Sequence, residues 1–256
     1  MLGRSRRLLM WAAVAILTAT AAGGSGLLAL QDSAAASSGL VAAYGFNEGS
    51  GSTVTDASGN GNNGTVANGT WSTTGKYGGA LKFNGTSTLV TIPNSASLQL
   101  SSGMTLEAWV NPSTVNGNWR DAIYKGNDNF YLEATSTNGS FPDAGLIGGG
   151  SYADAFGTAK LTANAWSFLT ETYDGSTLRL YVNGTQVAST AHTGAIATST
   201  NPLQIGGDSI YGQYFVGLID EVRVYNVALS AAQIQADQAS PVTSTPDTTP
   251  PSAPGT

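Results

Sequence analysis

The feature that most limits the fold of this chain is a series of short apolar or alternating runs from Leu40 to Tyr225. Gly, Asn and Asp interrupt these runs at intervals of roughly 8–12 residues. Such spacing is typical of the strands and tight turns of a β-sandwich, whereas βαβ units would place helical segments between the strands. The series therefore predicts an all-β fold.

The segment from Met104 to Val110 shows the alternation clearly. Met104, Leu106 and Val110 are separated by polar or aromatic residues such as Glu107 and Trp109. This period of two predicts a half-buried strand whose Met104, Leu106 and Val110 side chains point inward.

Three further runs between Trp166 and Val187 predict a meander. The first two flank Asp174-Gly175, and the second meets the third across Asn183-Gly184. Asn-Gly is a two-residue turn whose positive φ angles match the twist of an antiparallel hairpin.

Composition supports a chain of strands and turns. Only 10% of the residues are charged and 33 are glycine, which suits short strands better than helices. The one persuasive helical stretch is Ser230–Asp237, where Ser230 is placed to cap the first turn. The length of 256 residues is compatible with one folded domain between two terminal segments.

The charge balance and the absence of cysteine exclude several functions. Residues 1–36 are predicted to be a cleaved secretory signal, and they contain Arg4, Arg6, Arg7 and Asp32. Without them the chain has seven basic and 15 acidic residues and a formal charge of −8. This balance opposes contact with a phosphate backbone, so no nucleic-acid partner is expected. Without cysteine, the chain has no disulfide, thiolate nucleophile or cysteine-ligated zinc.

The first 36 residues have the order of a secretory signal. Three arginines precede the apolar run Leu8–Ala22, and the small-residue site Ala34–Ala36 follows. Cleavage after Ala36 would leave a secreted or cell-surface protein with no membrane attachment. An uncleaved anchor helix is the alternative, because apolar residues resume at Leu27–Leu30.

Residues 239–256 are predicted to be an extended linker. Ser240–Thr256 holds five of the nine prolines among Ser and Thr, with no apolar periodicity. Its last ten residues resemble the lead-in to fibronectin type III repeats, so we expect other domains of the same chain to follow. The folded module is then 37–238.

Five strings occur in a fixed order: Gly39–Gly64, Ala80–Val90, Met104–Pro112, Trp166–Gly184 and Gly217–Ser230. Together they resemble the laminin-G-like, concanavalin A-like jelly rolls of secreted bacterial multidomain proteins. The resemblance covers nearly the whole predicted module. It implies a two-sheet antiparallel jelly-roll β-sandwich with one short C-terminal helix, and relatives that bind sugars, proteins or calcium. Phe168 and Thr170 depart from the His and Ala that many relatives carry.

The sequence offers little for catalysis. The G-x-G-x-x-G string at 59–64 lies between β-type segments, with no helix to receive a pyrophosphate. His192 is the sole histidine, so a two-histidine metal or catalytic site is excluded. A satisfied loop histidine is the expected state of His192.

Glycoside hydrolysis needs two carboxyl groups flanking the scissile bond. The E-x-D-x-E string that laminarinase-type sandwich enzymes carry on one strand is absent, and adjacent Asp220 and Glu221 would point to opposite faces of a strand. Convergence of Glu107 with Glu133 or Glu171 stays open. We expect the protein to have no catalytic activity.

A calcium ion is one expectation for the loop near the N-terminus of the module. Oxygen donors recur at alternate positions from Asp56 through Asn60 to Asn62, but Ala67 stands where an EF-hand needs a bidentate Glu. The candidate metal ligands are Asp56, Asn60 and Asp220, since the last strand is expected beside the first. The alternative is an Asx-turn in which Asp56 and Asn60 bond their own backbone.

Three segments combine aromatic rings with hydrogen-bonding groups, which suits the apolar ring face and the hydroxyls of a sugar. The candidate ligand-binding residues are Trp119, Arg120, Asp121, Tyr152, Asp154 and Tyr211. Trp119 follows Gly117-Asn118 in a predicted loop, whereas Trp109 and Trp166 are expected in the core.

These features predict a secreted, non-catalytic binding module, most simply a glycan-binding accessory domain of a larger extracellular protein. One alternative is a structural or adhesive module that meets protein partners. A second alternative is a glycoside hydrolase on the same sandwich. One fold serves all three functions, so the site must decide between them.

Overall fold

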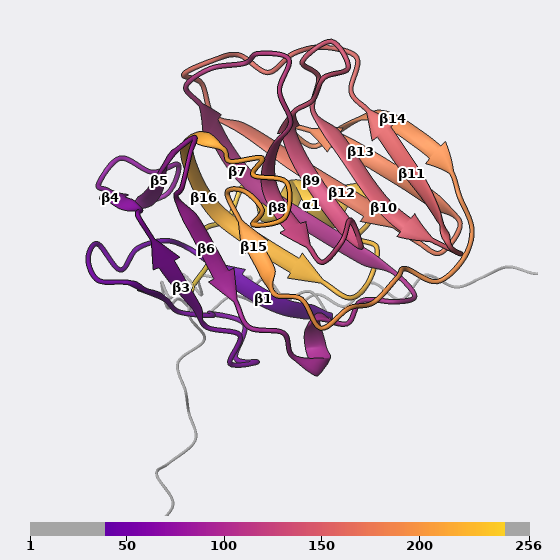
Figure 1. The fold of residues 1–256 in the computed structure, drawn as a ribbon, viewed down its shortest axis with the longest axis horizontal. Coiled ribbons are helices and arrows are strands. Elements are labelled where there is room, and N and C mark those ends of the chain that lie inside the picture. The colour runs from indigo at the N-terminus through magenta and orange to yellow at the C-terminus, as the bar shows by residue number, and fades with distance from the viewer. Residues whose placement is uncertain (1–38, 244–256) are drawn as a thin grey trace, which may run out of the picture. The chain divides into compact units, whose positions relative to one another are not determined.

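The computed structural model describes residues 39–243, which form two eight-stranded antiparallel sheets and one α-helix (Figure 1). The predicted signal, residues 1–36, and residues 244–256 of the predicted linker lie outside the described residues. Within 39–243, no helix has the length and apolar character needed to cross a membrane. The all-β, two-sheet prediction is confirmed.

Sheet A is built around β7 and β16, the two longest strands. In spatial order its strands are β14 (Thr185–Ala191), β13 (Thr177–Val182), β12 (Ser167–Tyr173), β7 (Met104–Pro112), β16 (Val216–Tyr225), β5 (Ala80–Asn84) and β4 (Thr70–Ser72), and β1 (Leu40–Tyr44) also pairs with β16. The last strand therefore runs beside the first, as the sequence predicted.

Sheet B lies against sheet A (Figure 1). In spatial order its strands are β11 (Ser151–Phe156), β10 (Asp143–Gly148), β9 (Phe130–Thr135), β8 (Arg120–Lys125), β15 (Leu203–Ile205), β6 (Leu89–Ile92), β3 (Gly64–Ala67) and β2 (Thr53–Val54). The 3-10 helix η1 (Ala96–Leu98) follows β6.

The predicted meander is present as β12, β13 and β14, which pair in sequence order. Asn183 and Gly184 form the hairpin turn between β13 and β14, with φ angles of 51° and 73°. Both residues are in the left-handed region that a tight two-residue turn requires, and Asn and Gly adopt it at low cost.

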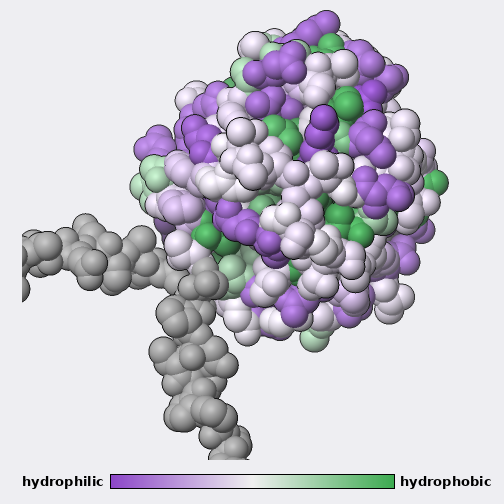
Figure 2. All heavy atoms as spheres, turned by 90° about the vertical axis from the view of Figure 1, so that its left-hand side faces the viewer, coloured by the Kyte–Doolittle hydropathy of each residue, from purple (hydrophilic) through white to green (hydrophobic). Residues whose placement is uncertain are grey.

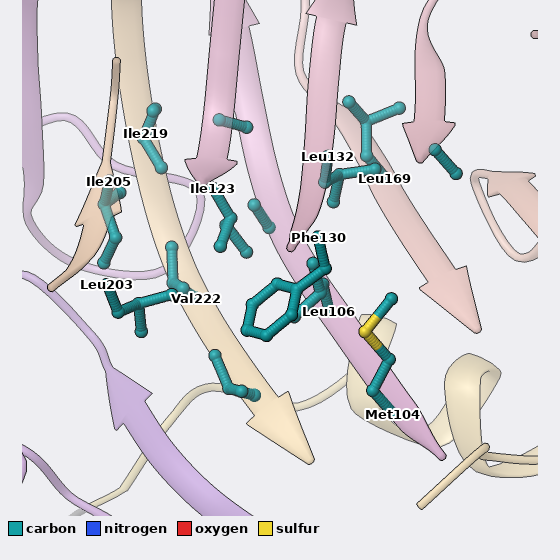
Figure 3. Packing of buried hydrophobic residues seen from close by; sticks show 14 of the residues in the cluster. Met104, Leu106, Ile123, Phe130, Leu132, Leu169, Leu203, Ile205, Ile219 and Val222 are labelled. Atoms are coloured by element: carbon teal, nitrogen blue, oxygen red, sulfur yellow. The ribbon is translucent and has the colours of Figure 1, made fainter. Parts of the chain in front are cut away.

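The main core lies between the two sheets. Figure 3 shows Leu106 and Met104 from β7 and Leu169 from β12 facing Phe130 and Leu132 from β9. Inward residues alternate with outward ones along each strand, which is how two sheets share one apolar interior. The inward positions predicted for Met104, Leu106 and Val110 are confirmed.

A second apolar cluster covers the outer face of sheet A. Its buried members are Trp109, Phe168, Tyr181, Tyr225, Leu229 and Ile234. Ile234 belongs to α1 (Ala231–Gln238), which Ser230 caps through a capping box with Gln233. Trp109 is therefore buried under the helix and not between the sheets, while Trp166 precedes β12 and is only half-buried.

The chain continues to contact the sandwich beyond α1. Arg223 Nη2 donates to the Ser240 carbonyl at 2.6 Å, and the Val242 amide donates to Glu221. Both Ser240 and Val242 fall in the predicted linker, so this linker begins along the surface of β16.

The face on the side of β3, β4 and β5 carries no extended apolar patch. In Figure 2, apolar residues on this face are separate spots among polar and weakly polar ones. Scattered apolar residues are normal on a folded surface, whereas large contiguous patches mark interaction sites. The candidate site has to be sought on another face.

Candidate functional site

A pocket of about 200 Å³ lies on the outer face of sheet B. It is lined by Trp119, Asp128, Tyr131, Glu133, Tyr211 and Gln213. Phe130, Leu132 and Ala134 of β9 belong to the main core, so Tyr131 and Glu133 project from the opposite side of the strand. The pocket is thus built where β9 turns its polar and aromatic side chains away from the core.

Strand register places three carboxyl groups in one row beneath this pocket. Glu133 of β9 is paired with Asp121 of β8 on one side and with Asp143 of β10 on the other. Side chains at paired positions of neighbouring strands lie on the same face and close together. We call Asp121, Glu133 and Asp143 the acid row.

The acid row is almost completely withdrawn from water. Asp121 and Asp143 have no exposed surface and Glu133 is 3% exposed. Burial and then the charge of Asp143 raise the pKa of Glu133 well above its ordinary value, and burial and then Glu133 do the same for the pKa of Asp121. Burial and the charge of Asp154 raise the pKa of Asp143 to about 8. These groups favour their neutral forms because like charges in a dry site oppose ionisation.

Two exposed tyrosines stand at the rim of the pocket. Tyr152 is 61% exposed and Tyr211 is 53% exposed. Their hydroxyls donate to the same oxygen, Asp128 Oδ2, at 3.1 and 3.2 Å, and Tyr124 donates to Asp128 Oδ1 at 3.0 Å. Asp128 therefore holds two rings from distant segments side by side.

Trp119 stands at the pocket as a half-buried ring in the loop before β8. Its ring centroid lies 6.1 Å from that of Phe156, and the planes are inclined at 44°. Phe156 supports one side of the indole, while the other candidate rings lie around the same pocket. The loop position predicted for Trp119 is confirmed.

The predicted ligand-binding residues converge, but they do not all reach the surface. Trp119, Tyr152 and Tyr211 lie at or beside the pocket, whereas Asp121 is buried below it. The Arg120 guanidinium is committed elsewhere, since its Nη1 donates to the Tyr214 carbonyl at 2.6 Å. The geometry therefore does not support the prediction that Arg120 and Asp121 contact the ligand.

Asp154 and Asp208 position two of the aromatic residues. Asp154 Oδ1 accepts the Tyr131 hydroxyl at 2.5 Å. Asp208 accepts the backbone amides of Ile210, Tyr211 and Gln213, which fixes the turn that presents Tyr211. The predicted candidate Asp154 thus acts on the pocket through a neighbouring ring.

Sequence reasoning missed four residues that line the pocket. They are Asp128, Tyr131, Glu133 and Gln213, of which Glu133 was considered only for catalysis. The signal was present in β9, where Phe-Tyr-Leu-Glu-Ala-Thr alternates apolar residues with Tyr131 and Glu133. This alternation separates two faces of a strand but leaves open which side carries a pocket.

The loop proposed for calcium is closed by its own hydrogen bonds. Asp56 Oδ1 accepts the amides of Ala43 and Ser58, and Oδ2 accepts the Asn62 amide and the Ser58 hydroxyl. The Asn60 side-chain amide donates to the Leu40 carbonyl. Saturated in this way, Asp56 and Asn60 fit the Asx-turn better than a calcium site.

Asp220 does not join that loop. Its Oδ2 accepts the amides of Lys76 and Tyr77 at 2.8 and 3.0 Å, and neighbouring Glu221 accepts the Val242 amide. Between residues 39 and 243, no three Asp, Glu, His or Cys side chains are placed to hold a metal ion. Calcium stays a prediction that these side chains do not support.

The carboxylates considered for hydrolysis occupy three different layers. Glu107 lies on the outer face of sheet A, beside Trp109 in β7. Glu171 lies on the same face of β12 as the core residues Leu169 and Tyr173 and points between the sheets. Glu133 lies on the outer face of sheet B. His192 is tied to the Gly148 carbonyl, with Nε2 at 2.8 Å. The possible convergence of Glu107 with Glu133 or Glu171 is therefore not formed.

Structural comparison finds solved domains with this fold. Domain 4 of AbnA, an extracellular arabinanase from Geobacillus stearothermophilus solved with arabinotriose, has a TM-score of 0.65 and 23% identity, over 78% of this chain and 98% of that domain. The binding domain of Paraclostridial Mosquitocidal Protein 1 has a TM-score of 0.66 and 17% identity, over 78% and 52%.

The binding domain of botulinum neurotoxin serotype G has a TM-score of 0.61 and 16% identity, over 78% of this chain and 50% of that domain. The chain thus spans about half the length of these toxin domains and nearly all of the arabinanase domain. At such identities the likeness concerns the fold.

Comparison of sequences gives the family. No curated protein matches the chain. A laminin-G-type family model, described as the concanavalin A-like lectin/glucanases superfamily, matches residues 84–235. This range begins in β5 and ends in α1, and therefore includes every strand that builds the pocket. On this match and on its two-sheet architecture, the chain belongs to the concanavalin A-like lectin/glucanase superfamily, as the resemblance of its five strings predicted.

Proposed function

We propose that this chain is a secreted, non-catalytic module that binds a glycan at the pocket on the outer face of sheet B. The observation that carries the proposal is the convergence of Trp119, Tyr152 and Tyr211, which come from three segments far apart in the sequence. Aromatic rings beside carboxyl, amide and hydroxyl groups suit a sugar, which has an apolar ring face and a polar edge.

The size of the pocket limits what it encloses. At about 200 Å³ it is smaller than the roughly 300–1,000 Å³ of typical small-molecule sites. One sugar unit would occupy the pocket, while neighbouring units would lie along the exposed rings of Tyr152 and Tyr211. The arabinotriose bound by the similar arabinanase domain supports this class of ligand.

A non-catalytic role is supported by the arrangement of the acids. The acid row favours its neutral form, whereas inverting and retaining hydrolysis both need an ionised carboxylate that acts on the sugar as a base or nucleophile. Two of the similar structures named above are described as binding domains, and the third is domain 4 of an arabinanase in complex with arabinotriose. Export depends on the predicted signal, and N-terminal mass spectrometry of the exported protein should find Ser37 first.

Trp119→Ala tests the site directly. The variant should weaken binding of an identified oligosaccharide by about 1–3 kcal/mol, the scale expected for losing an aromatic anchor. Calorimetry on a ligand first found by glycan array gives the affinity, and thermal unfolding gives the stability of the same sample.

The matched control is Trp71→Ala. Trp71 is also partly exposed, but it lies on β4 of sheet A, where its Nε1 donates to the Gly51 carbonyl. Affinity should be unchanged in this variant. Equal loss of affinity in both variants, or none in Trp119→Ala, would remove the pocket from the proposal and favour a protein partner.

A further inference from the structure

Among the described residues, acids line the pocket and bases do not. Two of its six lining residues are acids, three are aromatic and one is an amide, and no basic side chain of residues 39–243 lines it. Arg120 directly follows the pocket residue Trp119 in the sequence. Its guanidinium donates to the Tyr214 carbonyl and to Asn116 Oδ1. A sugar bearing a carboxylate or sulfate would find no positive side chain to pair with its charge, and an unpaired charge is costly to bury.

The carboxyl groups of Asp121 and Glu133 receive few hydrogen bonds from the rest of the protein. Asp121 is fully buried, and no amide, hydroxyl or basic group among the described residues donates to either of its oxygens. Glu133, its paired neighbour, lines the pocket and accepts the Arg120 backbone amide at 3.1 Å. Asp128 at the rim differs, because tyrosine hydroxyls satisfy both of its oxygens. A donor entering the pocket would therefore be drawn to Glu133.

A buried carboxyl without donors needs either a proton or a cation. A divalent metal ion requires six or more oxygen ligands of suitable geometry, and no such group of side chains is found between residues 39 and 243. An ammonium group is less demanding. It needs one or two acceptors, and aromatic faces within about 6 Å stabilise it. Trp119, Tyr131 and Tyr211 line the pocket and supply aromatic rings.

We propose that the pocket selects saccharides that carry a protonated amino group, with the ammonium at Glu133 and the sugar ring against the aromatic side chains. This inference rests on the proposed function and adds the chemical class of the ligand. The ammonium supplies the donor and the positive charge that the acid row lacks, in the manner of a charge-assisted hydrogen bond.

Binding of this kind displaces a proton. Burial raises the pKa of Glu133, which favours the neutral carboxyl in the free protein. An ammonium beside it favours the carboxylate, and the proton that leaves Glu133 is taken up by the buffer. Affinity should consequently rise with pH over the range in which the amine stays protonated.

The experiment compares two tetrasaccharides that differ only in the amino group. The full chain is titrated by calorimetry with a tetramer of β-1,4-linked glucosamine and with its fully N-acetylated counterpart, in two buffers of different ionisation enthalpy. The amine form should bind about tenfold or more tightly, as expected for one hydrogen bond to a charged group. Its apparent enthalpy should depend on the buffer, and that of the acetylated form should not.

Glu133→Gln removes the charge and keeps the shape and the acceptor for Arg120. It should reduce the preference for the amine to less than about threefold and abolish the dependence on buffer. The matched control is Glu107→Gln, a buried acid on the outer face of sheet A, which should leave both unchanged. An alkylammonium salt without a sugar ring should compete only weakly.

The outcomes separate this inference from the proposed function. Equal binding of the two tetramers, a preference for the acetylated one, or full competition by the alkylammonium salt would overturn the selection of amino sugars. Binding of a neutral oligosaccharide that depends on Trp119 would still uphold the glycan site. Failure of every oligosaccharide on a glycan array would instead remove the proposed function itself.

Discussion

The two outer faces of the sandwich are built from the same kind of strand, but a helix covers one face and the other carries a pocket. On sheet A, β7 alternates core residues with Glu107 and Trp109, and α1 covers this face with Ile234. On sheet B, β9 alternates core residues with Tyr131 and Glu133, and these side chains line a pocket. Each face thus carries an aromatic residue and a glutamate at alternate positions of a central strand.

The difference lies in what covers each face. A helix brings apolar side chains that fill the space over sheet A, so the ring of Trp109 packs 5.2 Å from that of Phe168. Over sheet B the cover consists of side chains from loops and turns, which leave a gap between Trp119 and Tyr211. A face closed by a secondary-structure element contributes to stability, whereas one covered by loops is available for binding.

The largest expected effect comes from a substitution on the outer face of sheet A, which α1 covers. Trp109→Ala should lower the free energy of unfolding by about 3–5 kcal/mol, because it empties a buried site of a large ring. Trp109 is 4% exposed, and Lys76 Nζ lies 4.0 Å from its ring centroid, so little water compensates the loss. Urea denaturation of this variant and of Trp119→Ala gives the comparison. Similar losses for both tryptophans would show that the two faces are equally closed.

The next effect concerns the pH dependence of the acid row. The pKa of Asp143 is raised from 3.8 to about 8, first by burial and then by Asp154. Between these two values the folded protein holds a proton that the unfolded chain releases, so this group makes stability fall as pH rises from about 4 to 8. Asp143→Asn removes that fall. The variant should gain about 2–4 kcal/mol relative to the original chain between pH 4 and pH 7.5, at about 1.4 kcal/mol for each pKa unit.

Asp174 provides a control of opposite sign. Hydrogen bonds from Ser176 and Arg179 outweigh burial and hold the pKa of this turn residue below its ordinary value. Its contribution is present near neutral pH and is lost as pH falls, so Asp174→Asn should matter at pH 7.5 and not in acid. Denaturant midpoints of the two variants across this range test both signs. Parallel pH curves would mean that the acid row titrates like surface carboxylates.

The alternation of side chains explains how much of this fold the sequence predicted. Met104, Leu106 and Val110 could be assigned to a core because a period of two divides any strand into two faces. Asn183-Gly184 fixed a hairpin because few residues tolerate two successive positive φ angles. These are local properties, and local properties are readable along the chain.

The site depended on relations that are not local. Trp119, Tyr152 and Tyr211 could be selected as aromatic residues beside polar ones, but only strand register brings them to one pocket. Asp121 was predicted among the ligand-binding residues, and the pairing of β8 with β9 places it in the buried acid row. A bulge between Arg120 and Asp121 contributes to this placement, and bulges leave no reliable mark in a single sequence.

The smallest expected effect extends the comparison to carboxyl groups that differ in their partners. Asp56 has both oxygens occupied by backbone amides and a hydroxyl, whereas Asp121 has neither oxygen occupied among the described residues. A calcium ion at the Asp56 loop would have to displace those donors. We therefore expect excess chelator and excess calcium to give the same melting midpoint.

A calcium site would be easy to detect in this experiment. A ligand that binds only the folded protein, present at a hundred times its dissociation constant, adds about 2.7 kcal/mol of stability. For a domain of this size that raises the midpoint by about 5–11 °C, at about 2–4 °C for each kcal/mol. A shift of that size that survives in Glu133→Gln and disappears in Asp56→Asn would restore the loop as a metal site. A shift that disappears in Glu133→Gln alone would place the cation at the acid row, where the donors are missing.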